Sequence, residues 1–300
     1  ASIGGISTII GSPPNLIGVQ YLAPAGIKID FLNWMLHALP VSLSMYGFLL
    51  FYINHHLKSC HFNPQNIALY LEQQTKNLQP LSRGERNTMG VFFLAVTLWL
   101  LPGLLNLFGL EQAYETVSKL LPESLVALIA AVLLFLLPSD KQLTGTLLTE
   151  DLRQIDWDTI LLFGGGIALG QLIISTGLAE HIGSNIAGLV SPENTLLLVF
   201  LLIVGILFMT EISSNTAISI TFVPIVINIL TDLQLPVLYP VFGVVLASSF
   251  AFMLPVATPP NAIVYGSGQI PITNMIKTGL WLNIAGAALI FAWVYVYMLL

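Results

Sequence analysis

Two copies of one polar element interrupt otherwise apolar stretches of the sequence. Each copy has a small hydroxyl residue, two prolines and an asparagine: Ser12-Pro13-Pro14-Asn15 and Thr258-Pro259-Pro260-Asn261. Because proline has no backbone N–H, each pair leaves two upstream carbonyl oxygens without a helical donor. A buried oxygen without a partner is costly, and a hard cation such as Na⁺ is a natural occupant of an interrupted membrane helix. A proline kink resolved by water and hydroxyls is the alternative, and the repetition of the element argues against it.

A third polar stretch, 211–216, separates two apolar arms of the segment 195–230, and 213–216 forms its tip. Its hydroxyl and amide oxygens suit a cation, whereas the N–H groups of the helix expected from Ala217 suit a carboxylate, because a helix N-terminus carries partial positive charge. Glu211 begins this stretch and is a functional candidate as an intramembrane carboxylate. The sequence leaves open whether Glu211 holds a proton, tunes a cation, faces water or bonds to the backbone.

No Lys or Arg occurs between Arg153 and Lys277, the part of the chain that contains the 213–216 stretch and the second proline pair. No permanent side-chain cation is therefore available there to a bound anion. A di- or tricarboxylate in such a low-dielectric site needs bound cations and helix dipoles to offset its charge, so cation and anion binding are predicted to be thermodynamically coupled.

The elements that position these residues must lie in a membrane. Apolar residues make up 56% of the chain and charged residues 8%, against about 25% charged residues in soluble domains. The net charge of −6 excludes nucleic acid as a partner, because phosphate binding needs clustered basic residues. The single cysteine excludes an internal disulfide. With no Ser/His/Asp or Cys/His constellation, we predict that the protein is not an enzyme.

Apolar runs of about 20 residues, the length needed to cross the bilayer core, predict an all-α polytopic membrane protein. The uninterrupted runs are 33–53, 88–108, 121–138, 157–178 and 276–300, and the interrupted ones are 1–22 and 237–268. Each arm of 195–230 has about 15 residues, which is marginal for a full crossing. A re-entrant hairpin is therefore favoured over a single kinked span. With the hairpin, all basic residues except Lys28 and Lys119 fall on one side, the cytoplasmic side by the positive-inside rule.

The two proline elements indicate an internal repeat, because Ala1-Ser2 and Ala247-Ser248 precede them at the same distance. Interrupted apolar segments at corresponding positions of two halves are typical of inverted-repeat transporters, with the binding site near the bilayer midplane. The sequence starts at Ala1 without Met and is apolar from its first residue. We therefore expect it to be a piece of a longer protein.

The run 2–5, the two proline elements and the Ser214-Asn215-Thr216 tip together resemble the divalent-anion/sodium symporter family of dicarboxylate, tricarboxylate and sulfate carriers. The resemblance covers the chain as the C-terminal two thirds of such a protein, and it implies a homodimer that works by an elevator motion. It implies a transport part at 1–53 and 191–300 and scaffold spans at 85–190. Between them, the longest polar stretch of the sequence carries spaced leucines and an isoleucine, which predict a cytoplasmic interfacial arm at 54–84.

The resemblance also implies two cation sites. It assigns Thr210, Ser213, Asn215 and Ala257 to the second site and Gly11 to the first. The residues that it places at the substrate carboxylates are Ser12, Ser214, Asn215, Thr216, Thr258 and Pro259. In the family a first Ser-Asn-Thr tip lies upstream of the segment that this chain matches, so the first cation site is expected to be incomplete here.

The predicted function is secondary active transport of a di- or tricarboxylate, with C4-dicarboxylates such as succinate favoured, coupled to Na⁺ import across a bacterial inner membrane. A sodium-independent dicarboxylate or citrate exchanger of the same fold stays open, because both subgroups can keep the same tips. An ion channel that uses the liberated carbonyls is the alternative from another class.

Overall fold

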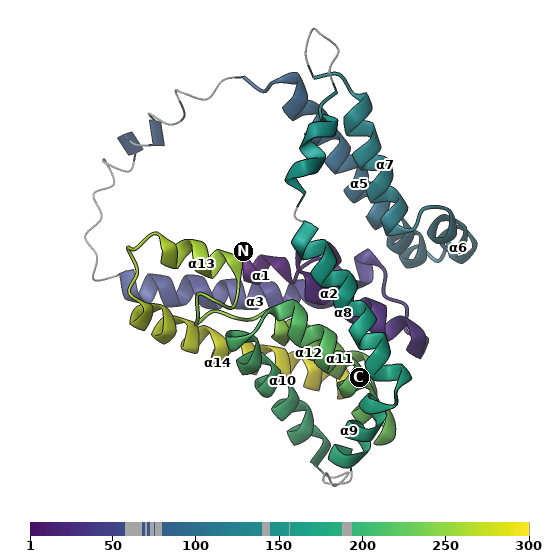
Figure 1. Ribbon diagram of the computed structural model, residues 1–300, viewed down its shortest axis with the longest axis vertical. Coiled ribbons are helices and arrows are strands. Elements are labelled where there is room, and N and C mark those ends of the chain that lie inside the picture. Colours follow the sequence, from purple (N-terminus) through teal and green to yellow (C-terminus); the bar gives the residue numbers. More distant parts are fainter. Residues whose placement is uncertain are drawn as a thin grey trace. The chain divides into compact units, whose positions relative to one another are not determined.

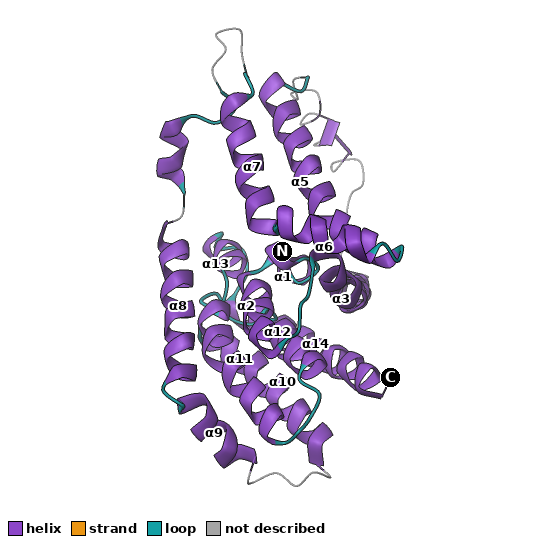
Figure 2. Cartoon of the chain, turned by 90° about the vertical axis from the view of Figure 1, so that its right-hand side faces the viewer, coloured by secondary structure: helices purple, strands orange, loops and turns teal. Residues whose placement is uncertain are grey.

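The computed structural model describes residues 1–57, 68–69, 71–72, 75, 80–139, 145–155, 157–187 and 194–299. These residues form helices and loops, apart from one isolated bridge between Pro138 and Gly145 (Figure 2). The predicted all-α class is confirmed. The chain divides into two compact units, one of 1–29, 33–51 and 157–300 and one of 30–32 and 52–156.

The first unit is built around two buried helices, α11 (Asn215–Asp232) and α12 (Leu238–Ser248) (Figure 1). α11 packs against α2 (Pro13–Leu22), α8 (Trp157–Ser175), α9 (Leu178–Ala187) and α12. α12 packs in turn against α2, α10 (Thr195–Ile212) and α14 (Ile272–Leu299). The remaining elements are α1 (Ser2–Gly5), η1 (Ile9–Gly11), η2 (Ala23–Ala25), most of α3 (Phe31–Leu57) and α13 (Pro259–Gly266).

The second unit packs α6 (Glu111–Leu120) and α7 (Glu123–Leu136) against α5 (Arg83–Leu107), and it includes η3 (Thr149–Gln154). A capping box starts α5: the Ser82 N–H donates to the Glu85 carboxylate at 2.7 Å, and the Glu85 N–H donates to the Ser82 hydroxyl at 3.2 Å. The indole N–H of Trp99 donates to the carbonyl of Glu123 at 3.1 Å and ties α5 to α7.

Five described helices are long and apolar enough to cross a membrane: α3, α5, α10, α11 and α14. The pair α6 and α7, bent by 55°, is a sixth candidate if it acts as one span. The protein is therefore a multi-pass membrane protein. The helices that form the two arms, α10 and α11, have 18 residues each rather than about 15, so the arms are longer than expected and closer to the length of a full crossing. Arm length alone does not argue for a re-entrant hairpin.

The helix breaks lie within the three predicted polar stretches, although one helix begins earlier than expected. α10 ends at Ile212 and α11 begins at Asn215, two residues earlier than Ala217. The proline pairs occupy the first two positions of α2 and α13, where a missing N–H costs nothing and the fixed φ favours the helix. The preceding residues are extended in both copies, with φ −150° and ψ 139° at Ser12 and φ −145° and ψ 148° at Thr258. Each proline pair thus starts a new helix after an extended residue.

Glycines allow the broken helices to approach their neighbours closely. A Cβ at Gly18 of α2 would lie 2.6 Å from a Val245 methyl of α12, and one at Gly279 of α14 would meet the Phe252 backbone. Small residues at such crossings are the usual means of close packing between membrane helices. The division into transport and scaffold parts remains a prediction, and most of the predicted arm 54–84 lies outside the described residues.

Candidate functional site

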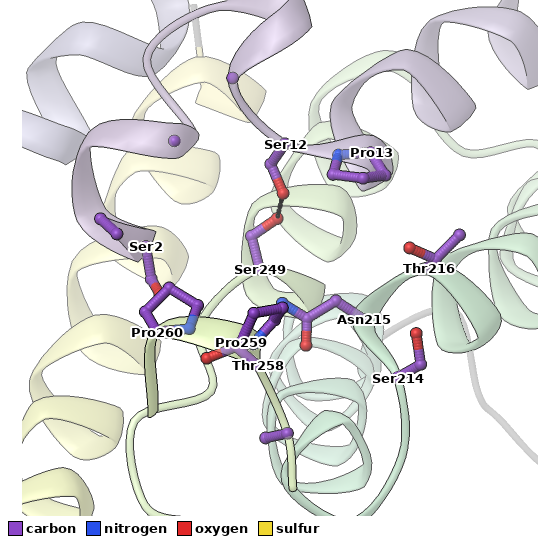
Figure 3. A pocket seen from close by; sticks show the side chains of 14 residues that line it. Ser2, Ser12, Pro13, Ser214, Asn215, Thr216, Ser249, Thr258, Pro259 and Pro260 are labelled. Carbon is purple, nitrogen blue, oxygen red and sulfur yellow. Dashed lines mark hydrogen bonds between the residues drawn. The ribbon is translucent and has the colours of Figure 1, made fainter. Parts of the chain in front are cut away.

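The two proline-element loops and the break between α10 and α11 surround one cavity of about 430 Å³ (Figure 3). All the predicted substrate residues line this cavity: Ser12, Ser214, Asn215, Thr216, Thr258 and Pro259. The structure therefore brings together positions that are more than two hundred residues apart in the sequence.

The asparagines of the two proline elements make the same pair of hydrogen bonds. The Asn15 amide donates to the carbonyls of Gly5 and Thr8, ten and seven residues upstream, at 2.9 and 2.7 Å. The Asn261 amide donates to the carbonyls of Ala251 and Leu254, again ten and seven residues upstream, both at 3.0 Å. Each asparagine thus closes the loop that leads into its helix.

Replacement of either asparagine by alanine is expected to lower the free energy of unfolding by about 1–3 kcal/mol, because two part-buried carbonyls lose their side-chain donor. The two losses should be similar, since the bonds are equivalent. Thermal unfolding of the full-length protein with Asn15→Ala or Asn261→Ala checks this. Asn274→Ala, at an exposed position, is the control. If Asn15→Ala or Asn261→Ala melts at as high a temperature as this control, the asparagine does not stabilise its loop.

The hydroxyl residues that precede α2 and α13 do not cap these helices. The Ser12 hydroxyl lies 3.1 Å from the Ser249 hydroxyl at the cavity wall (Figure 3). The Thr258 hydroxyl is buried and has no hydrogen-bond partner among the described residues. The second copy therefore keeps an unengaged hydroxyl beside the cavity, whereas the first copy's hydroxyl is already paired.

Three of the five predicted cation residues line the cavity: Gly11, Asn215 and Ala257. Thr210 and Ser213 are not among the lining residues. Thr210 is fully buried behind the tip, and its hydroxyl lies 2.6 Å from the Asn215 side-chain oxygen and 2.9 Å from the Ser248 carbonyl. Ser213 is the extended residue that ends α10. Among the described residues, no three His, Cys, Asp or Glu side chains gather, so the candidate cation ligands are neutral oxygens.

Glu211 is buried, with 3% of its surface exposed, and is surrounded by donors. Its carboxylate accepts hydrogen bonds from the backbone N–H groups of Phe252, Met253 and Leu254 at 2.8 to 3.0 Å. The Asn283 amide of α14 adds a fourth donor at 2.5 Å. This burial excludes the alternative that Glu211 faces water. The hydrogen bonds agree with the alternative that Glu211 bonds to the backbone. The carboxylate holds the loop between α12 and α13 against α10.

The hydrogen-bond donors at the cavity are distributed unequally among the three helix starts. α2 and α13 begin with prolines, which have no N–H, and the Asn15 N–H is already bonded to the Ser12 carbonyl at 3.1 Å. α11 begins at Asn215 without proline, so its first N–H groups have no partner within the helix. An anion in the cavity can therefore receive backbone donors from α11, and no Lys or Arg is among the lining residues.

Sequence reasoning missed several residues of the cavity wall. They are Ala1, Ser2, Gly5, Pro13, Ser249 and Pro260. Ser2 and Ser249 add hydroxyls to the wall (Figure 3). The paired Ala-Ser dipeptides at 1–2 and 247–248 were a usable signal for Ser2, whereas nothing in the sequence pattern singled out Ser249.

Comparison with known proteins found one matching family model and several similar bacterial proteins. A family model described as the sodium:sulfate symporter transmembrane region matches residues 1–300. A protein of Haemophilus influenzae described as an uncharacterized transporter is 31% identical over 304 residues, which cover 100% of this chain and 61% of that protein. The sodium-dependent dicarboxylate transporter SdcS of Staphylococcus saprophyticus is 31% identical over 302 residues, which cover 98% of this chain and 56% of that protein.

SdcS of Staphylococcus aureus strain USA300 is 32% identical over 307 residues, which cover 99% of this chain and 56% of that protein. The chain thus spans between 56% and 61% of the length of these relatives.

Proposed function

The chain belongs to the sodium:sulfate symporter family, the divalent-anion/sodium symporters, and from this premise we propose that it is the larger part of a sodium-coupled dicarboxylate transporter. The family and the named relatives are transporters, not enzymes. The observation that carries the proposal is the cavity itself, which is lined by hydroxyls, amides and helix ends and by no basic residue. C4-dicarboxylates such as succinate are the proposed substrates, and a bacterial inner membrane is the proposed location.

In this proposal the substrate carboxylates bind at the start of α11. Ser214, Asn215 and Thr216 supply hydroxyl and amide groups there, and the N–H groups of the first turn point toward the cavity end of the helix. Ser12, Thr258 and Pro259 face the same cavity from the starts of α2 and α13. The unengaged Thr258 hydroxyl is a ready donor to a carboxylate.

Two sodium ions complete the proposed site. Thr210, Ser213, Asn215 and Ala257 form the second cation site, in which the Thr210 hydroxyl donates a hydrogen bond to the Asn215 side-chain oxygen at 2.6 Å and holds it in place. Gly11 contributes to the first. Bound Na⁺ offsets the charge of the dicarboxylate, so each ligand raises the affinity for the other.

We further propose that the protein is a homodimer in which the transport part, 1–53 and 191–300, moves as an elevator against scaffold spans at 85–190. The shared hydrogen bonds of Asn15 and Asn261 support an internal repeat, and an inverted arrangement of the two copies follows from the proposal. The α10–α11 hairpin is re-entrant in this scheme.

Uptake of labelled succinate by the full-length protein in proteoliposomes tests the function. An inward Na⁺ gradient should raise the initial rate at least about tenfold over equal K⁺ or choline, because without Na⁺ the cavity offers no cation to offset the succinate charge and binds succinate weakly. Equal rates in all three salts would contradict coupling. Counterflow that depends only on internal succinate would assign the protein to the exchangers instead.

A further inference from the structure

A second cavity, of about 230 Å³, lies where α3 and α12 begin, away from the candidate transport site. Lys28, His37 and Tyr239 give it polar walls, and Phe242 closes it with an aromatic ring. None of its lining residues is acidic. A cationic side chain at the N-terminal ends of two helices makes this cavity suited to an anion, because both helix dipoles and the ammonium group favour negative charge.

The hydrogen bonding of His37 leaves one ring nitrogen for a ligand. Its Nδ1 lies 2.7 Å from the carbonyl oxygen of Asn33. A carbonyl can only accept, so Nδ1 carries the proton in this contact, and Nε2 is the nitrogen that remains.

An apolar groove of about 270 Å³ lies along α3 and α14 and shares no lining residue with this cavity. Pro40, Val41, Leu289, Ala292 and Val296 line it, together with Trp293 and Tyr297. The rings of Trp293 and Tyr297 also contact the His37 ring, with centroids 6.0 and 5.3 Å apart. A ring that lines the polar cavity thus contacts two rings that line the apolar groove.

The order of the two spaces along the membrane matches an amphipathic molecule. α3 is a candidate span, and the groove residue Ser44 lies two helical turns beyond His37, about 10 Å farther along the helix at 1.5 Å per residue. The polar cavity holds aromatic residues that are typical of the membrane interface. An amphipathic molecule would thus place its charged head in the polar cavity and its apolar chain in the groove.

We propose that this composite site binds an anionic phospholipid, with the phosphate at Lys28 and one acyl chain along the groove. A free organic phosphate shares the head chemistry but leaves the groove unfilled. A zwitterionic lipid fills the groove but gains little from Lys28, because its own ammonium group competes for the phosphate. The site lies outside the transport cavity and does not depend on which anion is transported.

Lipid retention by the full-length protein tests the proposal. Delipidated protein is incubated with equal amounts of phosphatidylglycerol and phosphatidylcholine of the same chain length, and retained lipid is counted by native mass spectrometry. The wild type should retain about fivefold more phosphatidylglycerol, the preference expected from one Lys near an anionic head group. Lys28→Gln should bring the ratio close to one. Lys119→Gln, whose ammonium pairs with Glu115 at 3.6 Å on the surface of α6, should keep the wild-type ratio.

Two further experiments distinguish binding of the lipid head group from binding of the acyl chain. Val296→Trp, at a half-exposed groove position, should reduce retention of both lipids, and glycerol phosphate at millimolar concentration should not displace them. Sodium-dependent uptake reports that the variants fold, because neither residue lines the transport cavity. A ratio that Lys28→Gln leaves unchanged overturns the proposal. Displacement by glycerol phosphate without an effect of Val296→Trp also overturns it, and assigns the cavity to a soluble phosphate.

Discussion

Glu211→Gln should destabilise the full-length protein by about 2–4 kcal/mol, the largest loss that we expect from a single polar substitution. The carboxylate accepts from three consecutive backbone N–H groups and from the Asn283 amide. A glutamine retains one acceptor oxygen and turns an NH₂ group toward the same donors, so buried N–H groups lose their partner. Thermal unfolding in detergent should show the apparent melting temperature fall by roughly 5–10 °C.

The same chemical change at an exposed carboxylate is the matched control for this variant. Glu180 of α9 is exposed, and Glu180→Gln should leave the melting temperature within about 1 °C, as is usual for surface substitutions. If both variants melt at the wild-type temperature, Glu211 does not hold the loop between α12 and α13. A loss of uptake without a loss of stability would instead return Glu211 to the role of a proton or cation ligand.

Asn215→Ala is expected to lower sodium-dependent succinate uptake by roughly 100-fold or more. Removing the amide leaves the buried polar groups that pair with it, in the site and on the ligand, without a partner. The Asn215 side-chain oxygen contacts the Thr210 hydroxyl at 2.6 Å, and the residue lines the cavity at the first position of α11. Its loss removes a proposed sodium ligand and a substrate contact together. Initial rates in proteoliposomes, taken over a range of Na⁺ concentrations, measure the effect.

Asn228 provides the control on the same helix. Its amide donates to the Pro224 carbonyl at 2.9 Å, one turn back along α11, and the residue does not line the cavity. Asn228→Ala should keep uptake within about twofold, since it removes only one local hydrogen bond. Uptake by Asn215→Ala at the wild-type rate, in protein of normal melting temperature, would remove Asn215 from the site.

The parts of the fold that depend on local chemistry were predictable from the sequence. Proline lacks an N–H at any position, so the pairs at 13–14 and 259–260 had to mark helix starts or kinks, and both start helices. Apolar runs likewise located the long helices. The all-α polytopic class followed from composition, and the residues of the tip and of both proline loops lie together at one cavity.

Long-range hydrogen bonds could not be predicted, because nothing in a local pattern specifies the partner. Glu211 meets N–H groups that are 41 to 43 residues away, and Ser12 meets Ser249 across 237 residues. The length of the α10 and α11 arms was underestimated, because the polar residues near the tip were counted as a break although they continue each helix. Contacts such as these decide whether a polar residue supports the loops or faces the ligand.

Isothermal titration calorimetry of succinate binding to the full-length protein, at fixed pH with Na⁺ replaced stepwise by choline, tests the central claim most directly. A cavity without basic side chains should bind a dicarboxylate only when cations accompany it, so the apparent affinity should fall at least tenfold for each tenfold drop in Na⁺ once the cation sites empty. Tight binding of succinate in choline alone, with the same affinity as in Na⁺, would contradict the account.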